Sequence, residues 1–285
     1  MNSVKTVLLL GLLSGLLLVG GEALGGRQGL VIGLLIAFGL NFFSYFFSDK
    51  LALKAYRAQP VTPSGNPEVY RRIGPLTETL CRRMELPTPR LWMIPNESPN
   101  AFATGRDPKH ASVAVTVGIL RLMNDQELEA VLGHELGHVR HRDILISSVA
   151  ATIATAITFM ARIAFFFGGS SDDDDGGNPF VGLAMLILAP VAAMVIQMAI
   201  SRTREYAADS ASARYTGSPD GMINALRKLE SGSRRIPMRA SPAHEHMFIV
   251  KPFGGGGVMK LFSTHPSTAD RIARLERNRH QLTAY

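Results

Sequence analysis

The pattern of apolar and polar residues divides the chain into four long apolar runs and two polar blocks. The apolar runs are Val4–Gly21, Leu30–Phe47, Ile144–Phe167 and Phe180–Ile200. Each is about 18 to 24 residues long, which is the length that a helix needs to cross a bilayer. We therefore predict two transmembrane hairpins, residues 1–47 and 144–200, and two polar blocks, residues 48–143 and 201–285, that fold together.

Each predicted hairpin has an alternative interpretation. The first run has the character of a signal peptide, but no small-residue cleavage site follows it and a second run begins after about eight residues. The third run is rich in Thr, Ala and Ser, so the third and fourth runs have an alternative as two buried helices of a soluble core. The length of all four runs favours membrane spans.

Charges at the ends of the runs predict their orientation. Basic residues follow the second run, precede the third and follow the fourth: Lys50, Lys54, Arg57, Arg140, Arg142, Arg202 and Arg204. The loop between the third and fourth runs instead carries Asp172–Asp175 and no Lys or Arg. By the positive-inside rule, both chain ends and both polar blocks lie in the cytoplasm.

Composition narrows the function classes. The 285 residues are 46% hydrophobic and carry a net charge of +7. Because the basic residues are scattered and no aromatic residues are interleaved with them, we expect no nucleic-acid partner. The single cysteine, Cys81, excludes an intramolecular disulfide, and its place in an amphipathic stretch favours a packed thiol over a nucleophile.

The first polar block predicts a helix and three strands. Apolar residues recur at helical spacing in Pro67–Met84, with Asn66 as the expected cap and Pro67 at the first helical position. Arg90–Ile94 reads as a short strand. Ala101–Thr104 and Ser112–Thr116 flank a polar turn and predict a β-hairpin.

Four further helices follow from capping and turn residues. Asn124 and Glu127 form a predicted capping box that opens a helix to about Arg142. The others are predicted at Arg202–Tyr215, at Asp220–Ser231 and from Ala269 to about Arg279, the last begun by Ser267 or Thr268. Ser233–Gly257, rich in Pro and Gly, is predicted to be a mobile loop.

The motif His134-Glu135-Leu136-Gly137-His138 carries the chemistry. Residues four apart on a helix share a face, so both imidazoles can bind one metal ion. Glu135 then projects beside the metal, where a carboxylate can accept a proton from a water molecule. Zinc suits such ligands. Gly133 and Gly137 each cost the helix about 1 kcal/mol relative to Ala, and we interpret them as leaving room around the ligands.

A third ligand is needed, and the residues alone leave several candidates: His141, Glu205, His244, His246 and His265. His141 is three residues after His138, and a helix does not easily bend three consecutive ligands onto one ion. Glu205 and Asp209 share a helix face. Glu205 can bind the metal while Asp209 orients a ligand histidine through its other ring nitrogen. A solvated acidic face is the alternative for this pair.

These features together resemble the HtpX-type membrane zinc metalloproteases, which are related to the CAAX-prenyl endopeptidases. The resemblance rests on the His-Glu motif, the two apolar runs after it and Ser201–Asp209. It covers nearly the whole chain and includes Asn100–Gly105, Ser263–Pro266 and Arg271.

The resemblance implies a fold and a function. The fold is mainly α with a small β-sheet: four transmembrane helices plus a cytoplasmic zincin-like metalloprotease domain. One Zn²⁺ per chain is held by His134, His138 and Glu205, and His265 lies near the catalytic Glu135. The implied location is the bacterial cytoplasmic (inner) membrane. The implied task is quality control, with damaged or unfolded membrane proteins as substrates and the lipid bilayer as a further partner.

Three expectations complete the picture. The hairpin is expected to bind an extended substrate by strand addition, through Asn100, Ala101, Phe102 and Val113. The donor to the oxyanion is expected to be His265 or Arg271. The rival functions are an intramembrane metalloprotease, which the polar flanks of the motif disfavour, and a scaffold or metal transporter with a residual zinc site, which would have no need of Glu135.

Overall fold

The computed structural model describes residues 52–143, 202–236 and 266–282, together with isolated positions between 28 and 50. Nearly all of these lie in one compact unit, formed by residues 48–144 and 201–285. Apart from those isolated positions, the four predicted membrane spans lie outside the described residues. Among the described residues, no helix combines the length and the hydropathy of a membrane span.

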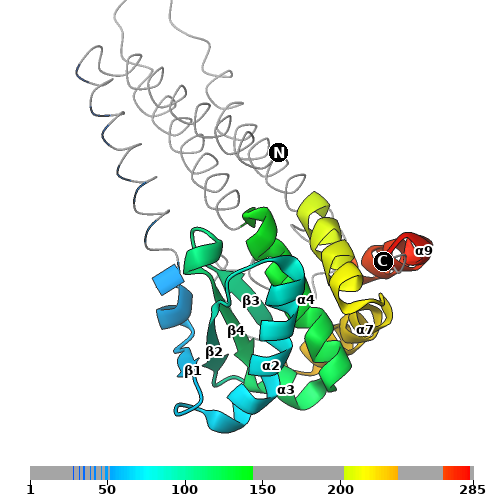
Figure 1. Cartoon of the computed structure of the whole chain (residues 1–285), viewed down its shortest axis with the longest axis horizontal. Coiled ribbons are helices and arrows are strands. Elements are labelled where there is room, and N and C mark those ends of the chain that lie inside the picture. Colours follow the sequence, from blue (N-terminus) through cyan, green and yellow to red (C-terminus); the bar gives the residue numbers. More distant parts are fainter. Residues whose placement is uncertain are drawn as a thin grey trace, which may run out of the picture. The chain divides into compact units, whose positions relative to one another are not determined.

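A four-stranded sheet forms one layer of this unit (Figure 1). Its strands are β1 (Gln59–Val61), β2 (Arg90–Ile94), β3 (Ala101–Thr104) and β4 (Ser112–Thr116). They lie in the order β1-β2-β4-β3, in which β2 and β4 are parallel and the other two pairs are antiparallel. The predicted bounds of β2, β3 and β4 and the β3–β4 hairpin are confirmed. β3 is an edge strand of the sheet.

Two helices cover one face of the sheet (Figure 1). These are α2 (Pro67–Met84) and α4 (Asp125–His141). The core between them and the sheet contains the buried side chains Ile73, Leu80, Val113, Val115, Leu132 and Leu136. The prediction of α2 is confirmed, and Asn66 is its N-cap residue, whose carbonyl accepts a hydrogen bond from the Tyr70 amide. Asn66 has left-handed backbone angles, and its side chain does not cap the helix, because the side-chain amide donates to the Pro60 carbonyl instead.

The other face of the sheet has its own apolar cluster, formed by Ile94, Phe102 and Ala114. Ala52 and Leu53, from the helical turn before β1, cover these side chains. Because both faces are packed, β4 is buried along its whole length. The sheet therefore provides a rigid support for the short helix 117–122 and for α4, the helices that follow β4 in the chain.

The helix α4 starts at a strong cap. Asn124 and Glu127 form the predicted capping box, and Glu127 also pairs with Lys228 at 2.7 Å. A short helix, α3 (Val117–Leu122), leads from β4 into this cap. Arg72 on α2 donates to the Leu120 and Met123 carbonyls and so fastens that connection. These contacts fix the start of α4.

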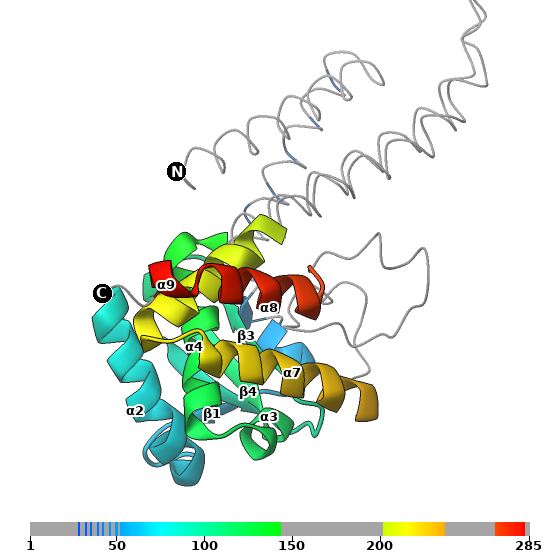
Figure 2. The ribbon, with the colours of Figure 1, turned by 90° about the vertical axis from the view of Figure 1, so that its right-hand side faces the viewer.

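The remaining helices pack on the side of α4 away from the sheet (Figure 2). They are the helix 202–216, α7 (Asp220–Arg235), α8 (Thr268–Arg277) and α9 (Arg279–Leu282). Ser267 caps α8, as expected. α7 continues to Arg235, past the predicted start of the mobile loop at Ser233; the rest of that loop, residues 237–257, lies outside the described residues. A 3-10 turn, η1 (Pro108–His110), connects β3 to β4.

Candidate metal centre

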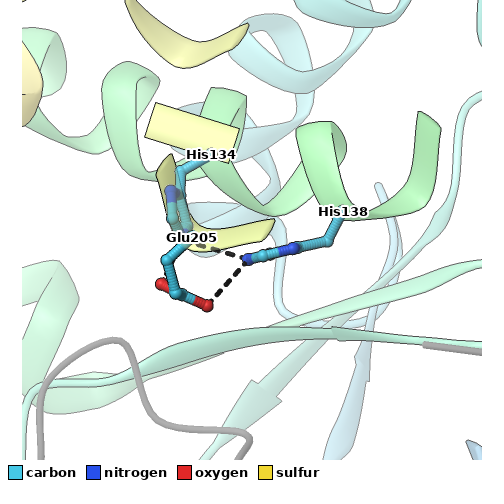
Figure 3. A group of neighbouring side chains, drawn as sticks. All are labelled: His134, His138 and Glu205. Atoms are coloured by element: carbon cyan, nitrogen blue, oxygen red, sulfur yellow. Dashed lines mark hydrogen bonds and ion pairs between the residues drawn. The ribbon is translucent and has the colours of Figure 1, made fainter. Parts of the chain in front are cut away.

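Three side chains from two helices meet beside β3. His134 and His138 lie one turn apart on α4, and Glu205 comes from the first turns of the helix 202–216 (Figure 3). The two Nε2 atoms are 3.2 Å apart. The Glu205 carboxylate lies 3.5 Å from His134 Nε2 through Oε2 and 3.4 Å from His138 Nε2 through Oε1. Of the described residues, only these three form a group that could hold a metal ion.

The donor atoms fit a zinc ion. In a tetrahedral site with metal–donor distances of about 2.0–2.1 Å, neighbouring donors lie about 3.3–3.4 Å apart. The distance between the two Nε2 atoms is close to this value, as is the distance from each Nε2 to the Glu205 oxygen that faces it. The surroundings also favour a cation, because Glu135, Asp143, Glu205 and Asp209 are all buried carboxylates. Arg271 is the one buried arginine among the described residues. Without a metal, the raised pKa values of His134 and His138 favour protonated rings among these carboxylates, and a divalent cation would take the place of those protons.

Small residues bring the two ligand helices together. A side chain at Gly137 would lie 3.1 Å from Ala208 Cα and 3.2 Å from Ala211 Cβ, on the helix 202–216. A side chain at Gly133 would lie 3.4 Å from Ser212 Cα. The interpretation of these glycines as room around the ligands is therefore wrong. They make room for the second helix, whose close approach lets Glu205 reach the histidines.

His134 is oriented by residues far away in the sequence. Its Nδ1 atom lies 2.9 Å from the Asp209 carboxylate. Arg271 on α8 binds the same carboxylate with Nε at 2.8 Å and Nη2 at 2.6 Å, and its Nη1 lies 3.3 Å from Glu205. Burial raises the pKa of Asp209, but Arg271 outweighs burial and lowers that pKa below its usual value. Asp209 is therefore a carboxylate, and it directs the Nε2 lone pair of His134 toward the site.

His138 has a carboxylate partner of its own. Its Nδ1 atom lies 2.9 Å from Asp143 Oδ2, just past the end of α4. Burial lowers the pKa of His138, but hydrogen bonds with Asp143 and Glu205 prevail and raise it to about 10. A metal ion competes with that proton for Nε2, so metal binding releases a proton. Asp143 was not predicted as a site residue.

Glu135 lies between the ligand helix and the edge strand. It is 4% exposed, and its Oε2 accepts a hydrogen bond of 2.8 Å from the Ala103 amide on β3. Burial raises the pKa of Glu135, and the neighbouring His134 and His138 oppose that rise. A raised pKa brings a carboxylate closer to neutral pH, where a general base works best.

The hydrogen-bonding pattern of β3 divides the predicted substrate-binding residues into two groups, those that pair with β4 and those that face away from it. The Asn100 carbonyl accepts from the Thr116 amide, and hydrogen-bonded positions alternate along an antiparallel pair. Phe102 therefore also pairs with β4, while Ala101 and Ala103 direct their backbone groups away from β4; Ala101 is buried at this edge and Ala103 is half-buried. Val113 cannot pair with a substrate, because β4 lies between β2 and β3; that expectation is corrected.

The other predicted site residues have varied outcomes. His244, His246 and His265 lie outside the described residues. His141 is half-buried and is not part of the three-residue metal group. Arg271 directs three nitrogens toward Asp209 and Glu205, and its Nη2 also lies 3.4 Å from His134 Nδ1, so it contacts two metal ligands and the carboxylate that supports one of them.

Comparison with known proteins places this geometry in a family. The sequence profile of peptidase family M48 matches residues 67–279. A protease HtpX homolog from Thermodesulfovibrio yellowstonii is 51% identical over 280 residues, which cover 97% of this chain and 98% of the relative. A second protease HtpX homolog, from Burkholderia cenocepacia, is 47% identical over 277 residues and covers 96% of both chains.

The fold also resembles a solved structure. The crystal structure of S. mikatae Ste24p superposes with a TM-score of 0.59 and 18% sequence identity. The match covers 96% of this chain but 65% of the Ste24p chain, so this chain spans about two thirds of that protein. At this identity the likeness concerns the fold.

Proposed function

The chain belongs to peptidase family M48 and is an HtpX-type metalloprotease, and from that premise we propose that it is a zinc-dependent endopeptidase of the cell membrane. The resemblance stated from the sequence is thereby confirmed at the level of the family. The observation that carries the proposal is the convergence of His134 Nε2, His138 Nε2 and a Glu205 oxygen beside the buried Glu135.

The three ligands would hold one Zn²⁺, which supplies a Lewis acid that polarises the scissile carbonyl and lowers the pKa of water. Asp209 and Asp143 hold the two imidazoles with Nε2 directed inward. The Ala103 amide holds Oε2 of Glu135, which leaves Oε1 to accept a proton from the attacking water. Glu135 then returns that proton to the nitrogen of the departing chain. His265 remains the proposed donor to the oxyanion.

We propose that the substrate binds along the edge of β3 that faces away from β4, where it would replace whatever buries Ala101 in the absence of substrate. An added strand would pair with Ala101 and with the Ala103 carbonyl, because the Ala103 amide is already held by Glu135. Recognition through the backbone favours unfolded chains over one particular sequence.

This placement is tested at Ala101. Proline is tolerated on a sheet edge where the amide does not pair with the next strand. Ala101→Pro should therefore raise KM for an unfolded substrate while zinc content stays unchanged; because Ala101 is buried, KM is measured well below the unfolding temperature of the variant. An unchanged KM would exclude strand addition at this edge.

The proposed setting is the bacterial inner membrane, with the metal centre on the cytoplasmic side. Supporting this are the four apolar runs and the basic residues that flank their inner ends. Damaged or misassembled membrane proteins are the proposed natural substrates. A site that binds its substrate through backbone hydrogen bonds requires an unfolded segment, and here that segment would have to lie beside the membrane.

The decisive experiment compares wild-type protein with Glu135→Gln and Glu205→Ala, purified in detergent from alkali-washed membranes. We expect one zinc per chain in the wild type and in Glu135→Gln, and little zinc in Glu205→Ala. Casein cleavage should be lost in both variants, for different reasons: one lacks the base and the other lacks a ligand. A wild type without zinc would overturn the proposal, and release of the protein by alkali would overturn its membrane location.

A further inference from the structure

Asp143 is a buried acid whose position is set by an unusual turn. α4 ends at Arg142, which has a left-handed backbone with φ 55° and ψ 37°. Residues other than glycine pay about 1–2 kcal/mol for that conformation. The Arg142 amide donates to the His138 and Val139 carbonyls, which closes the turn. The left-handed conformation of Arg142 therefore costs conformational free energy, and it turns the chain so that Asp143 lies beside α4.

The side chain of Asp143 then contacts a metal ligand. Asp143 is 3% exposed, and its Oδ2 lies 2.9 Å from His138 Nδ1. The contact repeats the one between Asp209 and His134, which also measures 2.9 Å. Each ligand histidine thus has one carboxylate on Nδ1, and each carboxylate selects the ring form whose Nε2 lone pair is available to a metal.

A second contact ties Asp143 to the other ligand helix. The Asp143 carbonyl accepts a hydrogen bond of 2.8 Å from Arg204 Nη1. Arg204 directly precedes Glu205, the third donor. Asp143 therefore contacts a histidine of α4 through its side chain and the helix 202–216 through its backbone. A change in the position of Asp143 would therefore move α4 relative to Glu205.

We propose that Asp143 is a positioning residue for the metal: its carboxylate fixes the ring of His138, and Arg204 holds it in place. This inference rests on the proposed zinc site and goes beyond it, because it assigns to residues outside the ligand set a role in how tightly the metal is held. Loss of an outer carboxylate of this kind weakens metal binding about 10- to 100-fold.

The chain offers a matched control. Asp107 and His110 form another carboxylate–histidine pair, 2.8 Å apart, but both side chains are solvent-accessible and neither contacts the metal group. Asp107→Asn keeps the cap that this residue provides to η1, because Asn caps as well as Asp. It removes a carboxylate from a histidine without touching the centre.

The test titrates zinc into metal-free protein in competition with a chromophoric chelator. We expect Asp143→Asn and Asp143→Ala to bind zinc about 10- to 100-fold more weakly than wild type, and Asp107→Asn to bind it equally well. The rise in unfolding temperature on adding zinc should also shrink in both Asp143 variants. A purely structural Asp143 would instead lower the unfolding temperatures of the metal-free and zinc-loaded protein equally and leave that rise unchanged.

The outcomes separate this inference from the proposed function. If wild type binds zinc and cleaves casein, but both Asp143 variants bind zinc within threefold of wild type, the inference fails and the protease stands. If wild type binds no zinc, both fail. Should the Asp143 variants not fold, Arg204→Met decides. It releases the Asp143 carbonyl and also removes a positive charge near Asp143 and Glu205, and that loss of charge on its own would strengthen the binding of a cation. Weaker zinc binding therefore supports the inference, and unchanged or stronger binding overturns it.

Discussion

His134 and His138 offer the same atom to the same site, yet their supports have different origins. The carboxylate on His138 belongs to the turn that ends its own helix. The carboxylate on His134 comes from the helix 202–216, and that carboxylate is held in turn by Arg271 on α8. The His134 side chain is 1% exposed and that of His138 is 15% exposed.

The difference shows that the support of one ligand is mainly local and that of the other is tertiary. The carboxylate that orients His138 belongs to the turn after its own helix, and Arg204 on the helix 202–216 additionally holds the carbonyl of that residue. His134 is oriented only when the helix 202–216 and α8 have both docked on α4. We therefore expect α8 to affect the metal through His134, by way of Asp209, and through Glu205, which Arg271 also contacts.

The largest effect should come from Arg271. Arg271→Met leaves Asp209 and Glu205 buried without their cation, and breaking a buried ion pair in this way costs about 3–5 kcal/mol. The free energy of unfolding of the metal-free protein should fall by that amount. In Arg271→Met/Asp209→Leu only Glu205 is left without this cation, so part of the stability should return, while zinc binding stays weak because His134 has lost its partner. Chemical denaturation and zinc titration measure the two effects.

Arg274 provides the control on the same helix. Its guanidinium lies 4.7 Å from the centre of the Tyr206 ring on the helix 202–216. Such an exposed cation–π contact is worth about 0.5–1 kcal/mol, so Arg274→Ala should weaken the docking of α8 slightly and leave zinc affinity unchanged. If Arg271→Met costs no more than Arg274→Ala, then His134 does not depend on the buried pair.

The same division between local and tertiary causes explains what the sequence could predict. β2, β3 and β4 were predictable because apolar and β-branched residues mark them between turn signals. β1 was missed because it has three residues and contains Pro60, which argues against a strand except at an edge. The parallel pairing of β2 with β4 depends on how the chain crosses in space, which no local pattern records.

The site follows the same rule. His134, Glu135 and His138 were found from helical spacing, and Asp209 from its place one turn after Glu205. Asp143 was missed because the turn that brings it to His138 has Arg142 where a glycine would signal a left-handed residue. The role of Ala103 was missed because it acts through its backbone amide, which every residue except proline possesses.

A smaller and sharper test uses the two glycines that flank the histidines. Alanine at Gly133 would meet Ser212 at ordinary contact distances of 3.4 and 3.5 Å, whereas alanine at Gly137 would meet Ala208 and Ala211 at 3.1 and 3.2 Å. Gly133→Ala should therefore be neutral or stabilising, by up to about 1 kcal/mol of helix propensity. Gly137→Ala should lose that gain to overpacking, which costs about 1–3 kcal/mol.

Zinc affinity distinguishes the two variants more clearly than stability does. At Gly137 the added methyl group presses on Ala208, which is three residues from Glu205, so it moves the third donor away from both histidines. Gly137→Ala should therefore bind zinc more weakly than wild type, and Gly133→Ala should bind it equally well. Equal affinity in both variants would mean that the helix 202–216 can shift without moving Glu205. In that case the spacing of the two helices would not set the geometry of the metal site, and the small residues would serve packing alone.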